Sequence, residues 1–198
     1  MSEPYSVLVE VTIERDALIA YLDATPRPAA AWSDWSRIGG EWHGFSWDKD
    51  LPRVLEMAGD SLVGSHRDVI AAIIAAEDLP GCERCAFDAA TRRFTFGTLM
   101  FSHNIDDIVR LFAAARGIGE FMRDGQSGFA VVQDYLWSEP IWTLAAMEIA
   151  AERSRFLDAQ ADAASWERYA RAATAAFDDI KAAGGATDLV TNNLDRLR

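Results

Sequence analysis

The alternation of apolar and polar residues at the start of the chain constrains the fold more than any other feature. Between Tyr5 and Ile13 every second residue is apolar, and Ser6, Glu10 and Thr12 lie between them. This period of two predicts a β-strand with one buried face. Glu14–Asp23 follows directly and carries apolar residues at helical spacing, and a Thr-Pro-Arg-Pro run at 25–28 predicts the end of that helix.

A strand pair, a second helix and a further strand are predicted in the middle of the chain. Cys85–Phe87 and Arg93–Phe101 predict a hairpin around residues 88–91, with Phe94 and Phe96 on one face and Leu99 and Phe101 on the other. Asn104 is expected to accept hydrogen bonds from the first turn of the next helix. The apolar stripe of that helix runs from Ile105 to Ala115. Phe129–Trp137 is the next predicted strand.

Strand, helix, hairpin, helix, strand is the order of an antiparallel ferredoxin-like βαββαβ sheet, so the predicted class is α+β. The 198 residues are expected to form one domain, residues 1–198, with an insertion at about 25–84. In the insertion, Arg37–Trp47 is compatible with a short strand. A helix is predicted over Pro52–Ala58, capped by Asp48 or Asp50, and another after Ser65 and Asp68.

The C-terminal part, about residues 138–198, is predicted to be helical and to pack on the sheet. Ser138 and Pro140 suggest one helix start, and Trp142, Ala145, Ile149 and Phe156 trace one face. Tyr169, Ala173, Phe177 and Ile180 trace the face of a second helix. A strand that begins at Ile141 is the alternative, because residues 141–144 are apolar and β-prone.

The formal net charge of −12 disfavours partners that are themselves anionic. Nucleic acids and anionic lipids both require Lys and Arg at the contact, so we expect neither as a partner. A basic protein would be attracted, although solubility alone also explains an acidic balance. No basic leader or run of about 20 apolar residues is visible, and two cysteines fit a reducing compartment. We therefore expect a cytoplasmic protein.

The motifs that carry chemistry are sparse. Cys82 and Cys85 form a CxxC, but a strand rather than a helix is predicted to follow, so the helix dipole that activates redox cysteines is absent. Zinc would need two further ligands. His43, His66 and His103 lie far apart without acidic partners at metal spacing, and none of the common nucleotide, hydrolase or metalloprotease motifs is present. No enzyme activity, cofactor or metal is expected.

Aromatic and acidic residues are concentrated between residues 32 and 50. Exposed aromatics mixed with acids are typical of a contact surface for a basic partner. The alternative is that the indoles form a satellite core of this segment. The usual burial of Trp side chains favours this alternative. The candidate partner-binding residues are Trp32, Asp34, Trp35, Glu41, Trp42, Trp47, Asp48 and Asp50.

The acidic charge, the Trp-rich stretch and the lack of a catalytic motif together resemble the immunity proteins that bacteria keep beside secreted antibacterial toxins. The resemblance implies an inhibitor that binds a basic toxin or enzyme and occludes its active site. A small-molecule enzyme or sensor is the second hypothesis, with Phe94, Phe96, Tyr135 and Trp137 lining a pocket on the sheet and His103 and Asp134 as its polar groups. A homodimer that covers exposed sheet is the third.

Overall fold

One antiparallel sheet organises the protein. The structure, a computed structural model, describes residues 3–38, 46–75 and 83–183. Within them every pair of neighbouring strands is antiparallel, and the order across the sheet is β2-β3-β1-β4-β5-β6. The strands are β1 (Tyr5–Thr12), β2 (Glu83–Asp88), β3 (Arg93–Ser102), β4 (Ser127–Asp134), β5 (Trp142–Ala150) and β6 (Arg153–Phe156). The α+β class is confirmed.

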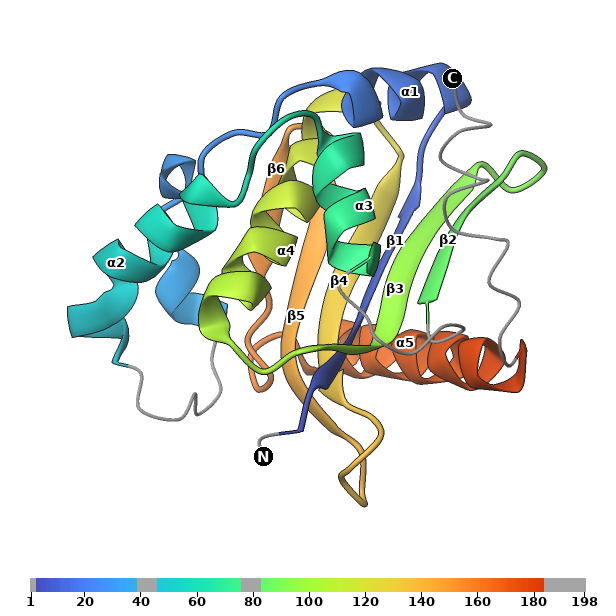
Figure 1. The fold of residues 1–198 in the computed structure, drawn as a ribbon. Helices are drawn as coiled ribbons and strands as arrows, with labels where there is room; N and C mark the ends of the chain where they lie inside the picture. The colour runs from blue at the N-terminus through green and yellow to red at the C-terminus, as the bar shows by residue number, and fades with distance from the viewer. Residues whose placement is uncertain (1–2, 39–45, 76–82, 184–198) are drawn as a thin grey trace.

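Helices cover both faces of this sheet (Figure 1). The described residues contain α1 (Arg15–Asp23), α2 (Trp47–Asp60), α3 (His66–Ala75), α4 (Ile105–Gly117) and α5 (Ala163–Ala183). The first four contribute to one hydrophobic cluster with Val7, Val9 and Val11 of β1. Among the described helices, α5 alone packs on the other face, against Leu8 and its neighbours. The central strand β1 is therefore buried on both sides.

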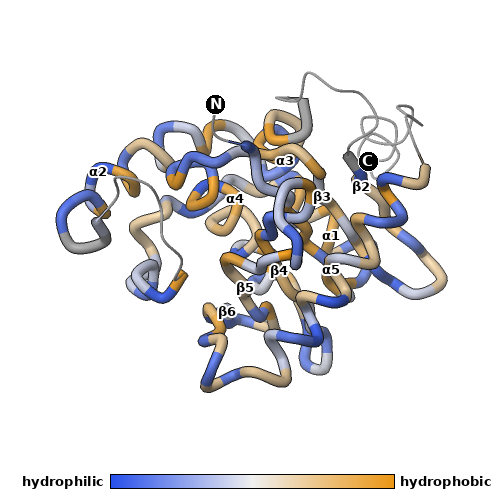
Figure 2. The backbone as a smooth tube through the Cα atoms, turned by 90° about the horizontal axis from the view of Figure 1, so that it is seen from below, coloured by the Kyte–Doolittle hydropathy of each residue, from blue (hydrophilic) through white to orange (hydrophobic). Residues whose placement is uncertain are grey.

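The described part of the insertion predicted at about residues 25–84 is helical up to Ala75, whereas residues 83–84 belong to β2. It contains two 3-10 turns, η1 (Ala29–Ala31) and η2 (Trp35–Ile38), followed by α2 and α3. A short strand was considered for Arg37–Trp47, but Arg37 and Ile38 belong to η2 and Trp47 belongs to α2. Residues 39–45 lie outside the described ranges. Figure 2 shows α2 as alternating hydrophobic and hydrophilic stretches, as expected of a helix with one face on the core.

Both helix starts predicted in the insertion are stabilised by carboxylates. Asp50 accepts a hydrogen bond from the backbone N–H of Ser46 at 2.8 Å, and α2 extends beyond its predicted bounds at both ends. Asp68 accepts from the backbone N–H of Ser65 at 2.8 Å, while Ser65 Oγ accepts from the N–H of Asp68 at 3.2 Å. The second arrangement is the predicted capping box.

The helix predicted after Ser138 is wrong, and the alternative strand is right. Residues 142–150 form β5 and residues 153–156 form β6, so only α5 is helical in the described part of the C-terminal region. The reason is burial on both faces of the sheet. Four consecutive residues of β5, Leu144–Met147, are buried, and such an uninterrupted apolar run has no period that separates helix from strand.

A bulge in β3 corrects one predicted pair of faces. Tyr5 pairs with Ser102, whereas Val7 pairs with Thr98, so β3 contains extra residues opposite this stretch of β1. Leu99 lies opposite Phe94 and Phe96, on the α5 side, as predicted, whereas the extra residues place Phe101 on the side of Phe94 and Phe96. Strict alternation along β3 would have placed Leu99 and Phe101 together.

Candidate functional site

Trp35, one of the predicted partner-binding residues, belongs to the core. Its side chain is fully buried, and its Nε1 donates a hydrogen bond to the backbone oxygen of Ala29 at 2.9 Å. Its ring packs against Trp32 and Phe156, with centroid distances of 6.3 and 5.8 Å. The prediction of a surface contact is therefore wrong for Trp35, and the alternative of a satellite core describes it better.

Asp34 is occupied by an internal partner. One of its oxygens accepts a hydrogen bond from Arg116 Nη1 at 2.7 Å, and Arg116 is almost completely buried. Burial alone would raise the pKa of Asp34, but the hydrogen bond and charge of Arg116 outweigh it, so the pKa lies below its ordinary value. Asp34 thus serves first to neutralise a buried cation.

The other predicted contact residues have mixed positions. Trp32 is half-buried, and Asp50 is half-buried and bonded to Ser46 as described. Trp47 and Asp48 form the first turn of α2, but their side chains lie outside the described structure. Glu41 and Trp42 lie outside the described residues altogether. A partner surface formed by these residues stays a prediction.

Among the side chains that the structure describes, the most exposed indoles lie on the connection between β4 and β5 and at the first residue of β5. Trp137, Ile141 and Trp142 expose 49, 39 and 57% of their surfaces. Single exposed apolar residues are common, but three within six positions of one connection form a patch. The other exposed large apolar residues of the described chain, Met57 and Val63, lie in α2 and just beyond it.

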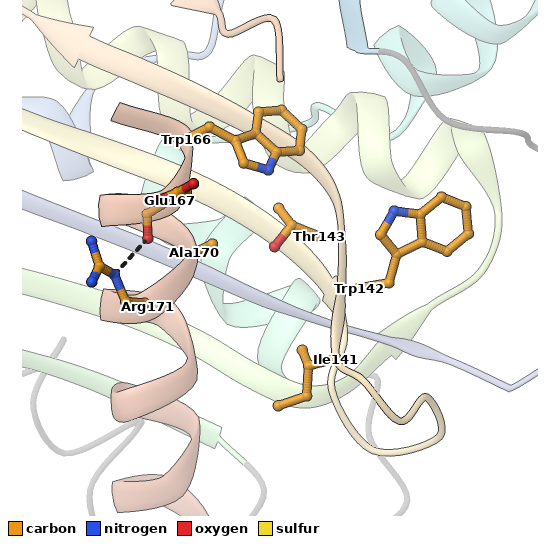
Figure 3. Close-up of a pocket in the computed structure, with 7 residues that line it drawn as sticks. All are labelled: Ile141, Trp142, Thr143, Trp166, Glu167, Ala170 and Arg171. Carbon is orange, nitrogen blue, oxygen red and sulfur yellow. Dashed lines mark hydrogen bonds between the residues drawn. The ribbon is translucent and has the colours of Figure 1, made fainter. Parts of the chain in front are cut away.

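A groove of about 420 Å³ borders this patch, and we call it the Trp142 groove. It lies between the start of β5 and one side of α5, and its lining consists of Ile141, Trp142, Thr143, Trp166, Glu167, Ala170 and Arg171. Figure 3 shows Trp166 projecting from α5 toward Thr143 of β5, whereas the ring of Trp142 points away from α5 on the far side of the strand and borders the groove at its edge. The groove is lined by one cationic side chain, Arg171, and one anionic side chain, Glu167, and both lie on α5. Arg171 Nε donates a hydrogen bond to the backbone oxygen of Glu167.

Gln133 holds the two walls of the groove together. This buried residue of β4 donates through Nε2 to Thr143 Oγ1 and to the backbone oxygen of Ala170, both at 3.0 Å. Its Oε1 accepts from Thr174 Oγ1 at 3.2 Å. One side chain therefore joins β4, β5 and α5 beneath the groove. Such a satisfied buried network limits the movement of the walls.

The pocket predicted on the sheet does not form. Phe94 and Phe96 are fully buried on the side of the sheet that carries α4, whereas Tyr135 packs on the opposite side against Phe177. Tyr135 donates to Asp178 at 2.6 Å, and burial, followed by this carboxylate, raises its pKa to about 12. The four aromatic residues therefore lie on different sides of the sheet or, for Trp137, in the exposed connection.

The polar groups expected in that pocket are also apart. His103 is exposed next to the start of α4, and Asp134 accepts hydrogen bonds from the Trp137 N–H at 3.3 Å and from Ser138 Oγ. Asn104 makes no side-chain cap; Ser102 Oγ instead accepts its N–H and donates to Asp107.

The cysteine and histidine candidates show no shared site. Cys85 is buried as a free thiol, and burial raises its pKa to about 12, which disfavours the reactive thiolate. Cys82 and His43 lie outside the described residues, and His66 is buried far along the chain from His103. In the described ranges no three His, Cys, Asp or Glu side chains are grouped as a metal site would require.

Sequence reasoning missed the patch because Trp142 was assigned to a helix face. A signal was available: four of the seven Trp residues lie in the stretch 32–47, and the three others are Trp137, Trp142 and Trp166. As the first residue of a strand, Trp142 would have been expected at the sheet margin. No helix in the described ranges has the length and apolar character needed to cross a bilayer. The chain matches no family model, no curated protein and no solved structure.

Proposed function

We propose that this protein acts by binding another protein through the Trp142 groove and the exposed patch beside it. The observation that carries the proposal is the exposure of Trp137, Ile141 and Trp142 on one connection. Trp is the residue most often found at interface positions that dominate binding, because burial of its large ring removes much apolar surface from water. The groove is braced by Gln133, so a partner loses little free energy in ordering it.

The proposed partner is a basic protein. The chain carries a formal net charge of −12, which accelerates encounter with a cationic surface and makes association sensitive to salt. Together with the resemblance to bacterial immunity proteins, this supports a narrower proposal: an inhibitor that occludes the active site of a basic toxin or enzyme. A cytoplasmic location fits the same proposal, since Cys85 is a free thiol.

The finer fold assignment is part of this proposal. The order β2-β3-β1-β4 with only antiparallel pairs, and the placement of α1 and α4 between strands, support a ferredoxin-like unit. On this view β5, β6 and α5 are additions to that unit. The Trp142 groove then lies entirely between the added elements.

The test is a binding measurement with the product of the adjacent gene. We expect tight association by titration calorimetry, with an association rate that falls as salt rises. Trp142→Ala should weaken binding at least tenfold, or about 1.4 kcal/mol, as expected for an interface hot spot. Val63→Ala is the matched control, because Val63 is 71% exposed but lies outside the groove, and it should bind like the wild type.

Two outcomes would contradict the proposal. Equal affinity of the Trp142 and Val63 variants for a tight partner would place the contact surface elsewhere. If light scattering instead shows a dimer of this chain that Trp142→Ala converts to a monomer, the patch serves self-association and the basic partner is wrong.

A further inference from the structure

A second cavity, of about 290 Å³, lies on another part of the molecule. It is formed where the segment after α1, the end of α4 with η3 (Ile118–Phe121), and the β5–β6 turn come together. Three arginines line it, with one indole, two carboxylates and a hydroxyl; the residues are Arg27, Arg116, Arg153, Trp32, Glu120, Glu152 and Ser154. None of these residues belongs to the Trp142 groove.

Arg116 supplies a fixed positive charge to this cavity. Its side chain is 1% exposed, and its guanidinium lies over the rings of Phe156 and Trp35 at 4.6 and 4.8 Å and of Trp32 at 5.5 Å. Nη1 is bonded to Asp34, but Nε and Nη2 have no hydrogen-bond partner among the residues that the structure describes. Buried charged donors without acceptors are costly, so their presence beside a cavity needs an explanation.

The remaining charges around the cavity are partly committed. Arg27 forms an ion pair with Glu120 at 2.9 Å, and its guanidinium also lies over Trp32 at 5.7 Å. Arg153 forms no ion pair with any described residue and is exposed. When Asp34 is counted with Glu120 and Glu152, three carboxylates balance the charge of the three arginines. What the cavity has in excess is therefore N–H donors, on Arg116 and Arg153, rather than net charge.

The backbone keeps these groups in place. Glu152 has a φ of 56° in the β5–β6 turn, and its N–H donates to the oxygen of Gly119 at 2.8 Å. A Cβ on Gly119 would lie 2.8 Å from the backbone oxygen of Ala150, so only glycine permits this close approach. The turn that carries Arg153 is thus anchored to the segment that follows Arg116.

We propose that this cavity binds a small anion, in which the oxygens of a carboxylate or phosphate accept hydrogen bonds from Arg153 and, after a shift of the Trp32 ring, from Arg116. Guanidinium groups match both acids through paired N–H donors. A volume of about 290 Å³ admits a small metabolite rather than a protein segment. The site is independent of the proposed protein-binding function.

The test uses inorganic phosphate and succinate as separate probes of the full chain at low ionic strength. In NMR titrations we expect saturable shifts of the Trp32 indole N–H and the Arg116 Nε–H, with a dissociation constant of about 1 mM or below. The probe that binds more tightly identifies the acid. Arg153→Ala should weaken binding about tenfold, whereas Arg123→Ala, which removes an exposed arginine outside the cavity, should leave it unchanged.

Arg116→Lys gives a further check, since it keeps the charge but loses the flat donor group. If that variant fails to fold, the Arg153 and Arg123 pair still decides the question. Absence of saturation by either probe up to about 10 mM would overturn the proposal, because that limit excludes even weak specific binding. Equal affinities of the Arg153 and Arg123 variants would also overturn it.

Discussion

The imidazole of His66 lies so close to Gly117 that a Cβ atom on Gly117 would be 2.5 Å from His66 Nε2. His66 begins α3 and Gly117 ends α4, so their contact joins two helices on the same face of the sheet. The ring also lies 4.2 Å from the Tyr21 ring of α1, between centroids. Three helices therefore meet at one histidine.

Gly117→Ala should destabilise the fold. The added methyl group collides with the ring of His66, and overpacking of this kind costs about 1–3 kcal/mol, which exceeds the gain of up to about 1 kcal/mol from the better helix propensity of alanine. Urea unfolding measures the difference. Gly59→Ala in α2 is the control: no atom lies within 4 Å of its Cβ, so we expect a gain of about 0.5 kcal/mol. A stable Gly117→Ala variant would show that His66 can move freely.

The same histidine should make stability depend on pH. Its Nδ1 lies 3.0 Å from the backbone oxygens of Tyr21 and Ala24, so Nδ1 carries the hydrogen, and the buried Nε2 has no hydrogen-bond partner in the described part of the chain. Burial lowers the pKa of His66 below its ordinary value, an effect that the hydrogen bonds to the two carbonyl groups only partly offset. The unfolded chain therefore binds the proton more readily than the folded chain.

The sign follows from this difference. The contribution of neutral His66 to the free energy of unfolding is fully present above the pKa of histidine in the unfolded chain, about 6.5. This contribution is lost as the pH falls below that value. Urea midpoints at about pH 7.5 and 5.5 should therefore differ more for the wild type than for His66→Gln. His103→Gln, at an exposed position, should keep the wild-type difference. An unchanged difference in His66→Gln would assign the pH dependence to other groups.

The alternation in residues 5–13 predicted β1 correctly because its pattern of polar positions survives even in a strand that is buried on both sides. The spacing of Trp142, Ala145, Ile149 and Phe156 predicted a helix over 138–156, but Leu144–Met147 is uniformly apolar, so that spacing does not separate a helix from a strand. Sequence period is informative only where polar residues mark one face of an element. In this sheet, which is covered on both faces, β1 keeps such polar positions at Ser6, Glu10 and Thr12, whereas the run Leu144–Met147 of β5 has none.

The candidate site was harder to predict for a related reason. Trp35 lies between Asp34 and Ser36 and Trp142 between Ile141 and Thr143, yet the indole in the more polar stretch is fully buried and the other is 57% exposed. What separates them is tertiary: Trp35 meets Phe156 of β6, more than 100 residues away, whereas Trp142 lies at the end of a strand. The pairing of Asp34 with Arg116 spans 82 residues and has no local signal either.

Asp34→Asn should cost more stability than the loss of an exposed ion pair. It leaves the guanidinium of Arg116 buried without a counter-charge, which we expect to destabilise the protein by about 2 kcal/mol. The matched control is Glu120→Gln, which breaks the exposed pair with Arg27 and should change the free energy of unfolding by less than about 0.5 kcal/mol. Chemical denaturation of the two variants provides the comparison, and equal losses would contradict a special role for Arg116.

Gln133→Leu should damage both stability and the Trp142 groove. The change removes the hydrogen bonds that join Thr143, Ala170 and Thr174, and it leaves the Ala170 oxygen with one partner fewer in a part-buried place. Loss of such a network costs about 1–3 kcal/mol. Thr143→Val removes one of these bonds at nearly constant volume and should cost about 1 kcal/mol. Under the proposed function, Gln133→Leu should also weaken partner binding at a temperature where the variant is still folded, because the walls of the groove are no longer held together. Retained affinity with lowered stability would show that Gln133 supports the fold alone and that the patch, without its braced groove, suffices for binding.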